Sequence, residues 1–289
     1  MSSQANQPLP EGFLLENYRI LRLLASGGFS FVYLAHDENE VPVAVKEYLP
    51  ATLALRTAEN PCPSVPEENM PTFRYGLKCF FEEGRALATL QHPNIVRVVN
   101  FFRANETVYL VMRYERGRTL QEHIHKKSGP IKEEWIRGTF APLLNGLREV
   151  HSHKLLHLDI KPGNVYVRND GSPLLIDFGA ARQQFSSEGL KLPPSYTPGF
   201  AAPEQYGGGT PLGPWTDIYA IGATLYASFA AGEPQPADER IKDDKRVPAR
   251  IAWKGKYSTQ LLDTVDWCMK LSHLDRPQSV FALQKALIG

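Results

Sequence analysis

The chain has 289 residues, a length that suits one large domain or two closely packed ones. Its 32 Lys and Arg residues nearly balance 31 Asp and Glu residues, so the net charge of +1 gives no case for binding a nucleic-acid backbone. A composition of 43% hydrophobic and 22% charged residues is that of a globular protein and excludes a wholly disordered chain.

The three cysteines, Cys62, Cys79 and Cys268, are widely spaced and odd in number, which fits neither a disulfide framework nor a CxxC metal site. We therefore expect a reducing compartment. No apolar run reaches the roughly 18 residues of a membrane helix, and the N-terminus lacks the pattern of a signal peptide. These patterns predict a cytoplasmic protein, or the cytoplasmic part of a longer one.

The first part of the chain predicts a small sheet with one helix. Residues 1–15 are polar and contain two prolines and a glycine, so we expect a flexible tail. Runs rich in β-branched and aromatic residues then predict strands at 18–24, 31–36, 41–48, 95–104 and 107–114. A helix is expected over 79–91, ending before a His-Pro pair.

From about residue 117 the hydrophobic periodicity becomes helical. Helices are expected over 135–154, 215–230, 259–271 and 279–287, with one hairpin over 165–176. The predicted fold class is α+β. It combines an N-terminal lobe (about 16–115), with a five-stranded antiparallel sheet plus one helix, and a mainly helical C-terminal lobe (about 117–289).

Two segments carry candidate chemistry. A Gly-rich hairpin at 24–32 can bring backbone N–H groups close to phosphate oxygens, although a turn that needs glycine for its geometry would look the same. Residues 157–164 contain a carboxylate, a lysine and an amide, and a second carboxylate, Asp177, follows 18 residues after Asp159. Carboxylate and amide oxygens suit Mg²⁺, and a lysine offsets phosphoryl charge. This pattern predicts phosphoryl transfer.

These motifs, in this order, resemble those of serine/threonine protein kinases, especially the eukaryotic-like kinases of bacteria. The similarity runs from about Tyr18 to about Ile288 and implies a two-lobed kinase fold. It implies transfer of the ATP γ-phosphate to Ser or Thr hydroxyls of proteins, including autophosphorylation, with Mg²⁺ or alternatively Mn²⁺. The implied partners are ATP and protein substrates, with no nucleic acid and no membrane segment in this chain.

The resemblance implies a role for each matching residue. Asp159 would be the catalytic base, Lys161 would contact the phosphate, and Asn164 and Asp177 would hold the metal. The ATP site would contain Lys46, whose partner on the helix would be Glu83, and Met112 as the gatekeeper. The backbone of Arg113 and Glu115 would also belong to it. Its other residues would be Leu24, Ala25, Ser26, Gly27, Gly28, Phe29, Ser30, Val32 and Ala44. Architecture and substrate docking would fall to Thr197, Glu204, Asp217 and Arg276, with Glu204 pairing with Arg276.

The sequence departs from the kinase pattern at three places. Only the central glycine, Gly27, of the family's three-glycine loop is kept, which we expect to affect nucleotide affinity while activity remains. Leu158 replaces the arginine that normally binds a phosphate on the activation loop, so we hypothesise that activity does not depend on that phosphate–arginine clasp. The hydroxyls Ser186, Ser187, Ser195, Tyr196 and Thr197 remain candidates for autophosphorylation.

A proline-rich insert at 49–78 is the third departure, and is too long for a bare connection. It is either a solvated surface loop or a regulatory element that touches the helix carrying Glu83.

The sequence supports two rival functions less well than it supports a protein kinase. A pseudokinase that binds nucleotide without chemistry would not need the complete set of Lys46, Glu83, Asp159, Asn164 and Asp177. A small-molecule kinase would not need the docking segment that ends at Glu204.

Overall fold

The computed structural model describes residues 6–126, 130–178, 196–207 and 209–288. These residues form two compact units. The first contains residues 6–91 and 96–115, and the second contains residues 92–95 and the described residues from 116 onwards.

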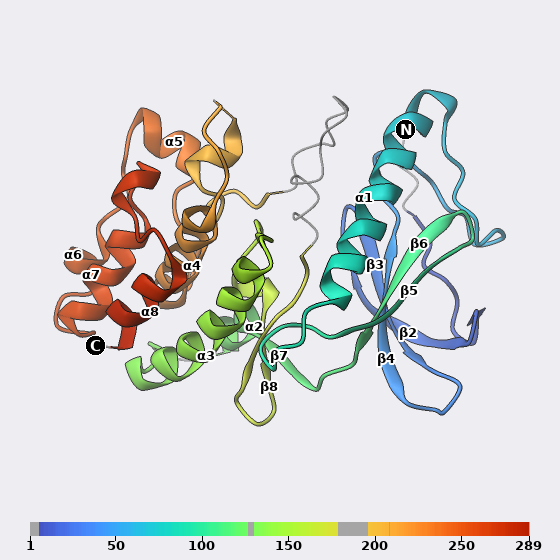
Figure 1. The fold of residues 1–289 in the computed structure, drawn as a ribbon, viewed down its shortest axis with the longest axis horizontal. Helices are drawn as coiled ribbons and strands as arrows, with labels where there is room; N and C mark the ends of the chain where they lie inside the picture. Colours follow the sequence, from blue (N-terminus) through green and yellow to red (C-terminus); the bar gives the residue numbers. More distant parts are fainter. Residues whose placement is uncertain (1–5, 127–129, 179–195, 208, 289) are drawn as a thin grey trace. The chain divides into compact units, whose positions relative to one another are not determined.

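The first unit is built on a six-stranded antiparallel sheet in the order β1-β2-β3-β4-β6-β5 (Figure 1). The prediction of five strands missed only a two-residue strand at one edge, because so short a run carries no alternating pattern. The strands are β1 (Leu14–Leu15), β2 (Tyr18–Ser26), β3 (Ser30–His36), β4 (Pro42–Tyr48), β5 (Val98–Ala104) and β6 (Thr107–Arg113).

One face of the central strands is covered by the N-terminal segment and by the loop after β4. Successive side chains of a strand point to opposite faces. On the covered face, Tyr33, Val45, Glu47, Tyr109 and Val111 are all fully buried. The cover contributes three buried apolar side chains to the same core, from Leu9, Leu15 and Ala54. Residues 6–15 thus pack on the sheet, which differs from the flexible tail that their polar composition predicts.

Helix α1 (Met70–Ala88), preceded by the 3-10 turn η1 (Glu67–Asn69), lies alongside this sheet (Figure 1). It begins at Met70 rather than at the predicted residue 79. Pro71 suggested a loop, but it lies in the first helical turn, where its missing N–H costs no hydrogen bond. The irregular part of the predicted 49–78 insert is correspondingly shorter and ends before η1.

The second unit is mainly helical, with a small three-stranded sheet in the order β7-β8-β9. Its strands are β7 (Gly117–Thr119), β8 (Val165–Arg168) and β9 (Pro173–Leu175). Its helices are α2 (Leu120–Lys126), α3 (Glu133–Ser152), α4 (Pro214–Ala230), α5 (Ala237–Lys242), α6 (Ala249–Ala252), α7 (Thr259–Cys268) and α8 (Val280–Ile288). Short 3-10 turns lie at η2 (Pro162–Asn164), η4 (Pro203–Tyr206) and η5 (His273–Asp275).

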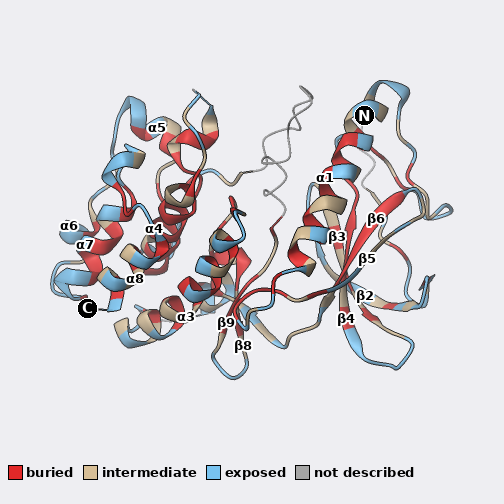
Figure 2. Ribbon diagram, in the orientation of Figure 1, coloured by how far each residue is buried: buried red, intermediate tan, exposed pale blue. Residues whose placement is uncertain are grey.

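Helix α4 is the core of the second unit and is buried along most of its length (Figure 2). A helix that is apolar on all sides is typical of a position enclosed by other helices, and α4 packs against α7 and α8. The four helices predicted in this part of the chain are α3, α4, α7 and α8, each within a few residues of its predicted bounds. Among the described residues, no helix is both long and apolar enough to cross a membrane.

Candidate active site

In the first unit, Lys46 lies on the central strand β4, between β3 and β6. It pairs with Val32 on one side and Leu110 on the other, and its side chain is buried. The Lys46 Nζ is 5.5 Å from the centre of the Phe80 ring on α1. Glu83 follows Phe80 by three residues, which places both on one face of the helix. The Glu83 side chain is buried, so the same part of α1 presents a carboxylate toward the sheet.

The neighbouring carboxylate, Glu82, has a different environment. Its side chain is 37% exposed and forms an ion pair with Arg85 at 3.5 Å. Both glutamates lie on the predicted helix at 79–91, and the family resemblance implied Glu83 as the partner of the strand lysine. The buried Glu83 is the better candidate for the partner of Lys46, because a solvated carboxylate such as that of Glu82 gains little from an ion pair.

The predicted adenine contacts lie on the half-exposed face of the same sheet. Ala44 pairs with Met112, and Val32 pairs with Lys46, so these four side chains share one face. Val32, Ala44 and Met112 are half-buried, in contrast to the fully covered opposite face. The Arg113 N–H donates to Arg97 O at 2.9 Å, and the Arg113 Nε lies 3.7 Å from a Glu115 carboxylate oxygen.

The Gly-rich hairpin joins β2 and β3 over Leu24, Ala25, Ser26, Gly27, Gly28, Phe29 and Ser30. The Gly27 N–H donates to Ser30 O at 2.9 Å, and the Gly28 carbonyl accepts from Ala51 N–H at 2.9 Å. Neither glycine has a positive φ, and a Cβ at Gly28 would meet nothing within 4 Å. The turn itself does not require Gly28, which removes the turn-geometry explanation for that glycine.

In the second unit, the carboxylate of Asp159 is surrounded by three of the predicted site residues. Its Oδ1 accepts from Thr197 Oγ1 at 2.8 Å, and its Oδ2 lies 2.8 Å from Lys161 Nζ and 3.0 Å from Asn164 Nδ2. Lys161 Nζ also donates to Thr197 Oγ1 at 2.6 Å. Asp159, which is half-buried, therefore has a fixed orientation, with one lysine to balance its charge.

Asp217, at the start of α4, fixes the backbone that precedes Asp159. Its Oδ2 accepts from His157 N–H at 2.9 Å, and its Oδ1 accepts from Leu158 N–H at 2.8 Å. Burial tends to raise the pKa of the Asp217 carboxyl, but the hydrogen bond from His151 and the charge interactions with both histidines hold that pKa below its usual range. A buried carboxylate that accepts several N–H bonds stays ionised.

His157 is neutral in this arrangement. Burial lowers the pKa of its imidazole, against the attraction of Asp217. Its Nδ1 lies 3.3 Å from the Asp159 N–H, and its Nε2 lies 3.2 Å from Ile176 O. An acceptor at Nδ1 and a donor at Nε2 are the two roles of one neutral tautomer.

Asn164 and Asp177 lie at the two ends of the β8–β9 hairpin, where the chain segments before and after it run side by side. Val165 pairs with Leu175, and Asn164 O accepts from Ile176 N–H at 3.0 Å. Asp177 is therefore only one residue beyond the residue that bonds to Asn164. Asn164 Nδ2 donates to the Asp159 backbone O and to its carboxylate, so the amide oxygen is the atom that can face a cation. An amide oxygen beside a carboxylate fits Mg²⁺. Asp177 has φ of 62°, a left-handed conformation that is uncommon for residues other than glycine, that aspartate adopts more readily than most, and that is found at functional sites.

Glu204 and Arg276 form the ion pair expected from the sequence. The Arg276 Nη1 and Nη2 atoms contact the two Glu204 carboxylate oxygens at 2.8 and 3.0 Å, and both side chains are buried. Glu204 Oε1 also accepts from Thr216 Oγ1 at 2.9 Å. Bidentate geometry and burial make this a strong pair that joins η4 to the segment before α8.

Sequence reasoning missed two features of these units. Gln205 follows Glu204 and bonds to the backbone next to Asp159. Arg56, in the loop after β4, forms a buried ion pair with Glu47. A glutamine or an arginine in a loop gives no periodic signal, so only the structure reveals these contacts. The expected phosphorylation sites Ser186, Ser187 and Ser195 lie outside the described residues.

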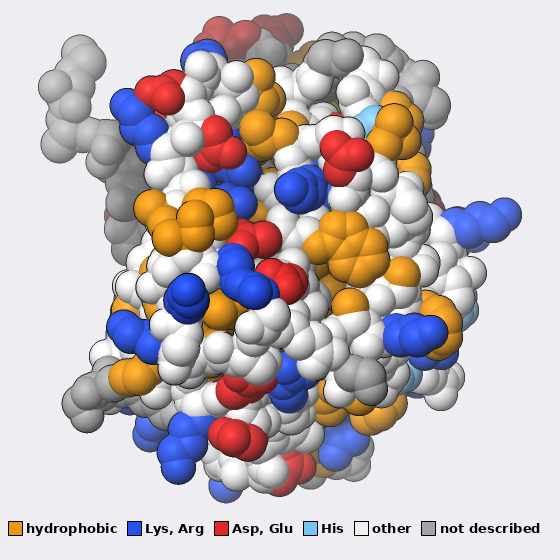
Figure 3. Space-filling view, turned by 90° about the vertical axis from the view of Figure 1, so that its left-hand side faces the viewer, with side chains coloured by type: hydrophobic (Ala, Val, Ile, Leu, Met, Phe, Trp, Pro, Cys, Tyr) orange, Lys and Arg blue, Asp and Glu red, His pale blue; other side chains and the backbone are white. Residues whose placement is uncertain are grey.

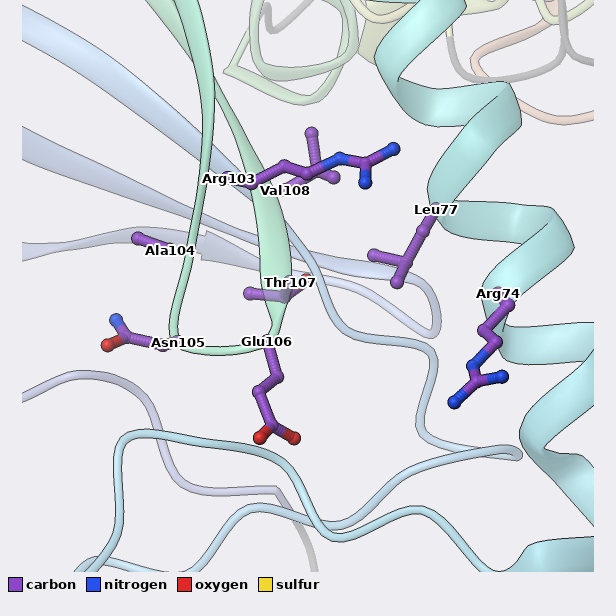
Figure 4. A pocket seen from close by; sticks show the side chains of 8 residues that line it. All are labelled: Arg74, Leu77, Arg103, Ala104, Asn105, Glu106, Thr107 and Val108. Atoms are coloured by element: carbon purple, nitrogen blue, oxygen red, sulfur yellow. The ribbon is translucent and has the colours of Figure 1, made fainter.

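A separate cavity of about 490 Å³ lies in the first unit between α1 and the β5–β6 hairpin (Figure 4). Arg74 and Leu77 line it from the helix, and residues 103–108 line it from the hairpin. None of these lining residues belongs to the predicted ATP site.

On the helical face of the second unit, acidic and basic side chains are interspersed (Figure 3). Ion pairs such as Arg250–Asp263 and Arg246–Asp266, at 2.7 and 2.8 Å, belong to α6, α7 and the segment before α6.

An aspartate bonded to a lysine and a threonine, with an asparagine and a second aspartate at the two ends of the adjoining hairpin, is the set of groups that phosphoryl transfer needs. The protein kinase domain family matches residues 18–288, and the chain belongs to that family. Serine/threonine-protein kinase D of Synechocystis sp. is 29% identical over 282 residues, covering 93% of this chain and 47% of its own length. Sperm motility kinase 3A of Mus musculus is 30% identical over 262 residues, covering 90% of this chain and 47% of its own length.

Solved structures show the same two-lobed kinase fold. PpkA-294 in its apo form has a TM-score of 0.85 and 34% identity, over 97% of this chain and 99% of that one. The PknI kinase domain of Mycobacterium tuberculosis has a TM-score of 0.71 at 20% identity, over 98% of this chain and 99% of that one, which is evidence for the fold alone. The resemblance to bacterial serine/threonine kinases is thus confirmed, and the α+β fold class with it. The chain spans about half the length of these curated relatives.

Proposed function

We propose that this domain transfers the γ-phosphate of ATP to Ser or Thr hydroxyls of proteins, itself included. The observation that carries the proposal is the Asp159 carboxylate, oriented by Thr197 Oγ1, Lys161 Nζ and Asn164 Nδ2. A carboxylate held in this way can accept or orient the proton of an acceptor hydroxyl. Lys161, within 2.8 Å of the same carboxylate, can offset charge on the phosphoryl group in transfer.

The remaining residues would bind and orient the nucleotide. Lys46 would contact the α- and β-phosphates with Glu83 as its partner, below the loop from Leu24 to Ser30. The half-exposed face around Ala44 and Met112 would accept the adenine, and the backbone at Arg113 and Glu115 would bond its edge. Asn164 and Asp177 would hold Mg²⁺ or Mn²⁺, which neutralises phosphate charge when bound.

The docking of a protein acceptor rests on the segment from Thr197 to Glu204. Thr197 touches both Asp159 and Lys161, and its hydroxyl is compatible with a serine or threonine acceptor beside the carboxylate. Glu204 and Arg276 keep this segment attached to the helices. Three cysteines without a disulfide, all within described parts of the chain, suit a reducing, cytoplasmic setting.

The test is transfer of ³²P from labelled ATP to the chain and to casein, with Mg²⁺, comparing the native chain with Asp159→Asn. We expect a loss of at least about 100-fold in the variant, because it removes the carboxylate but keeps the shape. Phosphosite mass spectrometry should find modified Ser or Thr. Binding of ATP by the native chain without transfer would instead indicate a pseudokinase, and equal transfer by both chains would remove Asp159 from its role.

A further inference from the structure

The peptide between Leu158 and Asp159 is held in an unusual conformation. Leu158 has φ of 63°, in the left-handed region that is unfavourable for a leucine. Its N–H donates to Asp217, and its side chain is buried in a small apolar cluster with Leu156 and Leu212. Strained backbone of this kind persists only where several contacts fix it.

Gln205, in the turn η4, provides a contact on the other side of Leu158. Its Nε2 donates to Leu158 O at 2.8 Å, and its Oε1 accepts from Ala202 N–H at 2.9 Å. The two partners define the orientation of the amide, because a flipped amide would place like groups against each other. The Gln205 side chain is buried among these groups, so water cannot easily replace either bond.

The bond from Gln205 acts on the peptide plane that carries Asp159. The Leu158 carbonyl and the Asp159 N–H belong to one planar peptide group. Gln205 binds its oxygen, and His157 Nδ1 lies 3.3 Å from its nitrogen. Rotation of this plane would turn the Asp159 carboxylate away from Thr197 and Lys161. Gln205 is therefore placed to determine where the carboxylate points.

We propose that Gln205 is a positioning residue that couples the docking segment to Asp159 without an activation-loop phosphate. The proposal rests on the proposed kinase function and deepens it. Leu158 cannot bind a phosphate as arginine does. The structure offers two phosphate-independent attachments instead, namely Thr197 at the Asp159 side chain and Gln205 at the Leu158 backbone.

The test compares Gln205→Glu with Gln205→Leu, using labelled ATP and casein. At pH 8 the introduced carboxylate keeps an acceptor for Ala202 N–H but cannot donate to Leu158 O. In both variants at pH 8 we expect kcat to fall at least about tenfold while KM for ATP changes less than about twofold, since the lost contact orients Asp159 only. Gln284→Glu is the matched control, because its Nε2 also donates to a backbone carbonyl, that of Ala141. It should retain native kcat.

Acidification separates positioning from a general loss of stability. Gln205 is buried, and burial raises the pKa of the introduced carboxyl above its usual value of about 4.3. As the pH falls from 8 to 6, a growing fraction of this carboxyl therefore protonates and can again donate to Leu158 O. The kcat of Gln205→Glu relative to the native chain should therefore rise severalfold, while that of Gln205→Leu stays constant. An unchanged kcat in Gln205→Glu at pH 8, or a ratio that does not rise on acidification, would overturn the proposal. A native chain that transfers no phosphate would instead overturn the proposed function.

Discussion

At the residue scale, the carboxylate of Glu47, which follows Lys46 on β4, is buried and held by three side chains. It accepts hydrogen bonds from Tyr33 and Tyr109 at 2.7 Å and forms a buried ion pair with Arg56. Arg56 Nε also donates to the Gln7 carbonyl at 2.8 Å. One arginine thus joins the insert, the N-terminal segment and the strand of the predicted ATP lysine. These contacts are to the strand and the N-terminal segment, so the interpretation of the insert as a regulatory element that touches the helix carrying Glu83 stays a prediction.

Replacing Arg56 should therefore be costly. Arg56→Met leaves a buried carboxylate without its counter-charge, and we expect the free energy of unfolding to fall by about 3–5 kcal/mol. Urea denaturation measures this. Arg19→Met is the matched control: Arg19 pairs with Glu40 at 2.5 Å, but both side chains are at least half exposed, so its loss should stay below about 1 kcal/mol. Equal losses in the two variants would contradict the role of burial.

At the element scale, the contact between α1 and the sheet depends on a glycine. A Cβ at Gly76 would lie 1.9 Å from the Tyr48 hydroxyl, and Tyr48 is itself buried between Phe73 and Phe80. This close approach brings α1, which carries Glu83, against β4, which carries Lys46. A small residue in the helix therefore positions two predicted site residues at once.

Gly76→Ala should lower the free energy of unfolding by about 1–3 kcal/mol, since the methyl group must displace a packed ring. The comparison is Gly138→Ala on α3, which is exposed and where a Cβ would meet nothing within 4 Å. That variant should gain about 0.5–1 kcal/mol, because alanine suits a helix better than glycine. Thermal or urea unfolding of both variants measures these changes in the free energy of unfolding. A stabilising effect at both positions would show that α1 can move off the sheet at no cost.

At the scale of the whole molecule, stability should depend on pH through two histidines and one aspartate of the second unit. Burial lowers the pKa of His157, and also that of His92. Asp217 keeps a pKa below its usual range despite its burial. All three groups bind protons less readily when folded, so their effects on the unfolding equilibrium have the same sign.

We expect the free energy of unfolding to be nearly constant at pH 7–8 and to fall as the pH drops below about 6.5, the pKa of histidine in an unfolded chain. His157, which is fully buried, can contribute a slope of up to about 1.4 kcal/mol per pH unit, because the unfolded state then takes up a proton that the folded state refuses. His92 is partly exposed, so its contribution is smaller. The Asp217 contribution is lost only at still lower pH. Urea denaturation from pH 8 to 5, with NMR titration of His157, provides the test. Constant stability over that range would contradict it.

The local sequence determined the elements and the chemistry. Strand alternation, helical periodicity and the order of Lys46, Asp159, Asn164 and Asp177 identified the fold class and the family, because these patterns reflect which side of an element is buried and which atoms phosphoryl transfer needs. The helix start at Met70 was missed because Pro71 is a loop residue by composition and a first-turn residue by geometry.

The sequence led us to expect the Glu204–Arg276 pair, but tertiary structure alone decided several other polar contacts. Glu82 and Glu83 are adjacent residues of the same type, yet only the Glu83 side chain is buried against the sheet. The Arg56–Glu47 pair and the contact of Gln205 with Leu158 join residues that are 9 and 47 positions apart. Their partners depend on how distant segments pack, and no periodic pattern encodes that. The balanced charge of the chain likewise says nothing of these few buried ions, whose energetics depend on desolvation and on their partners.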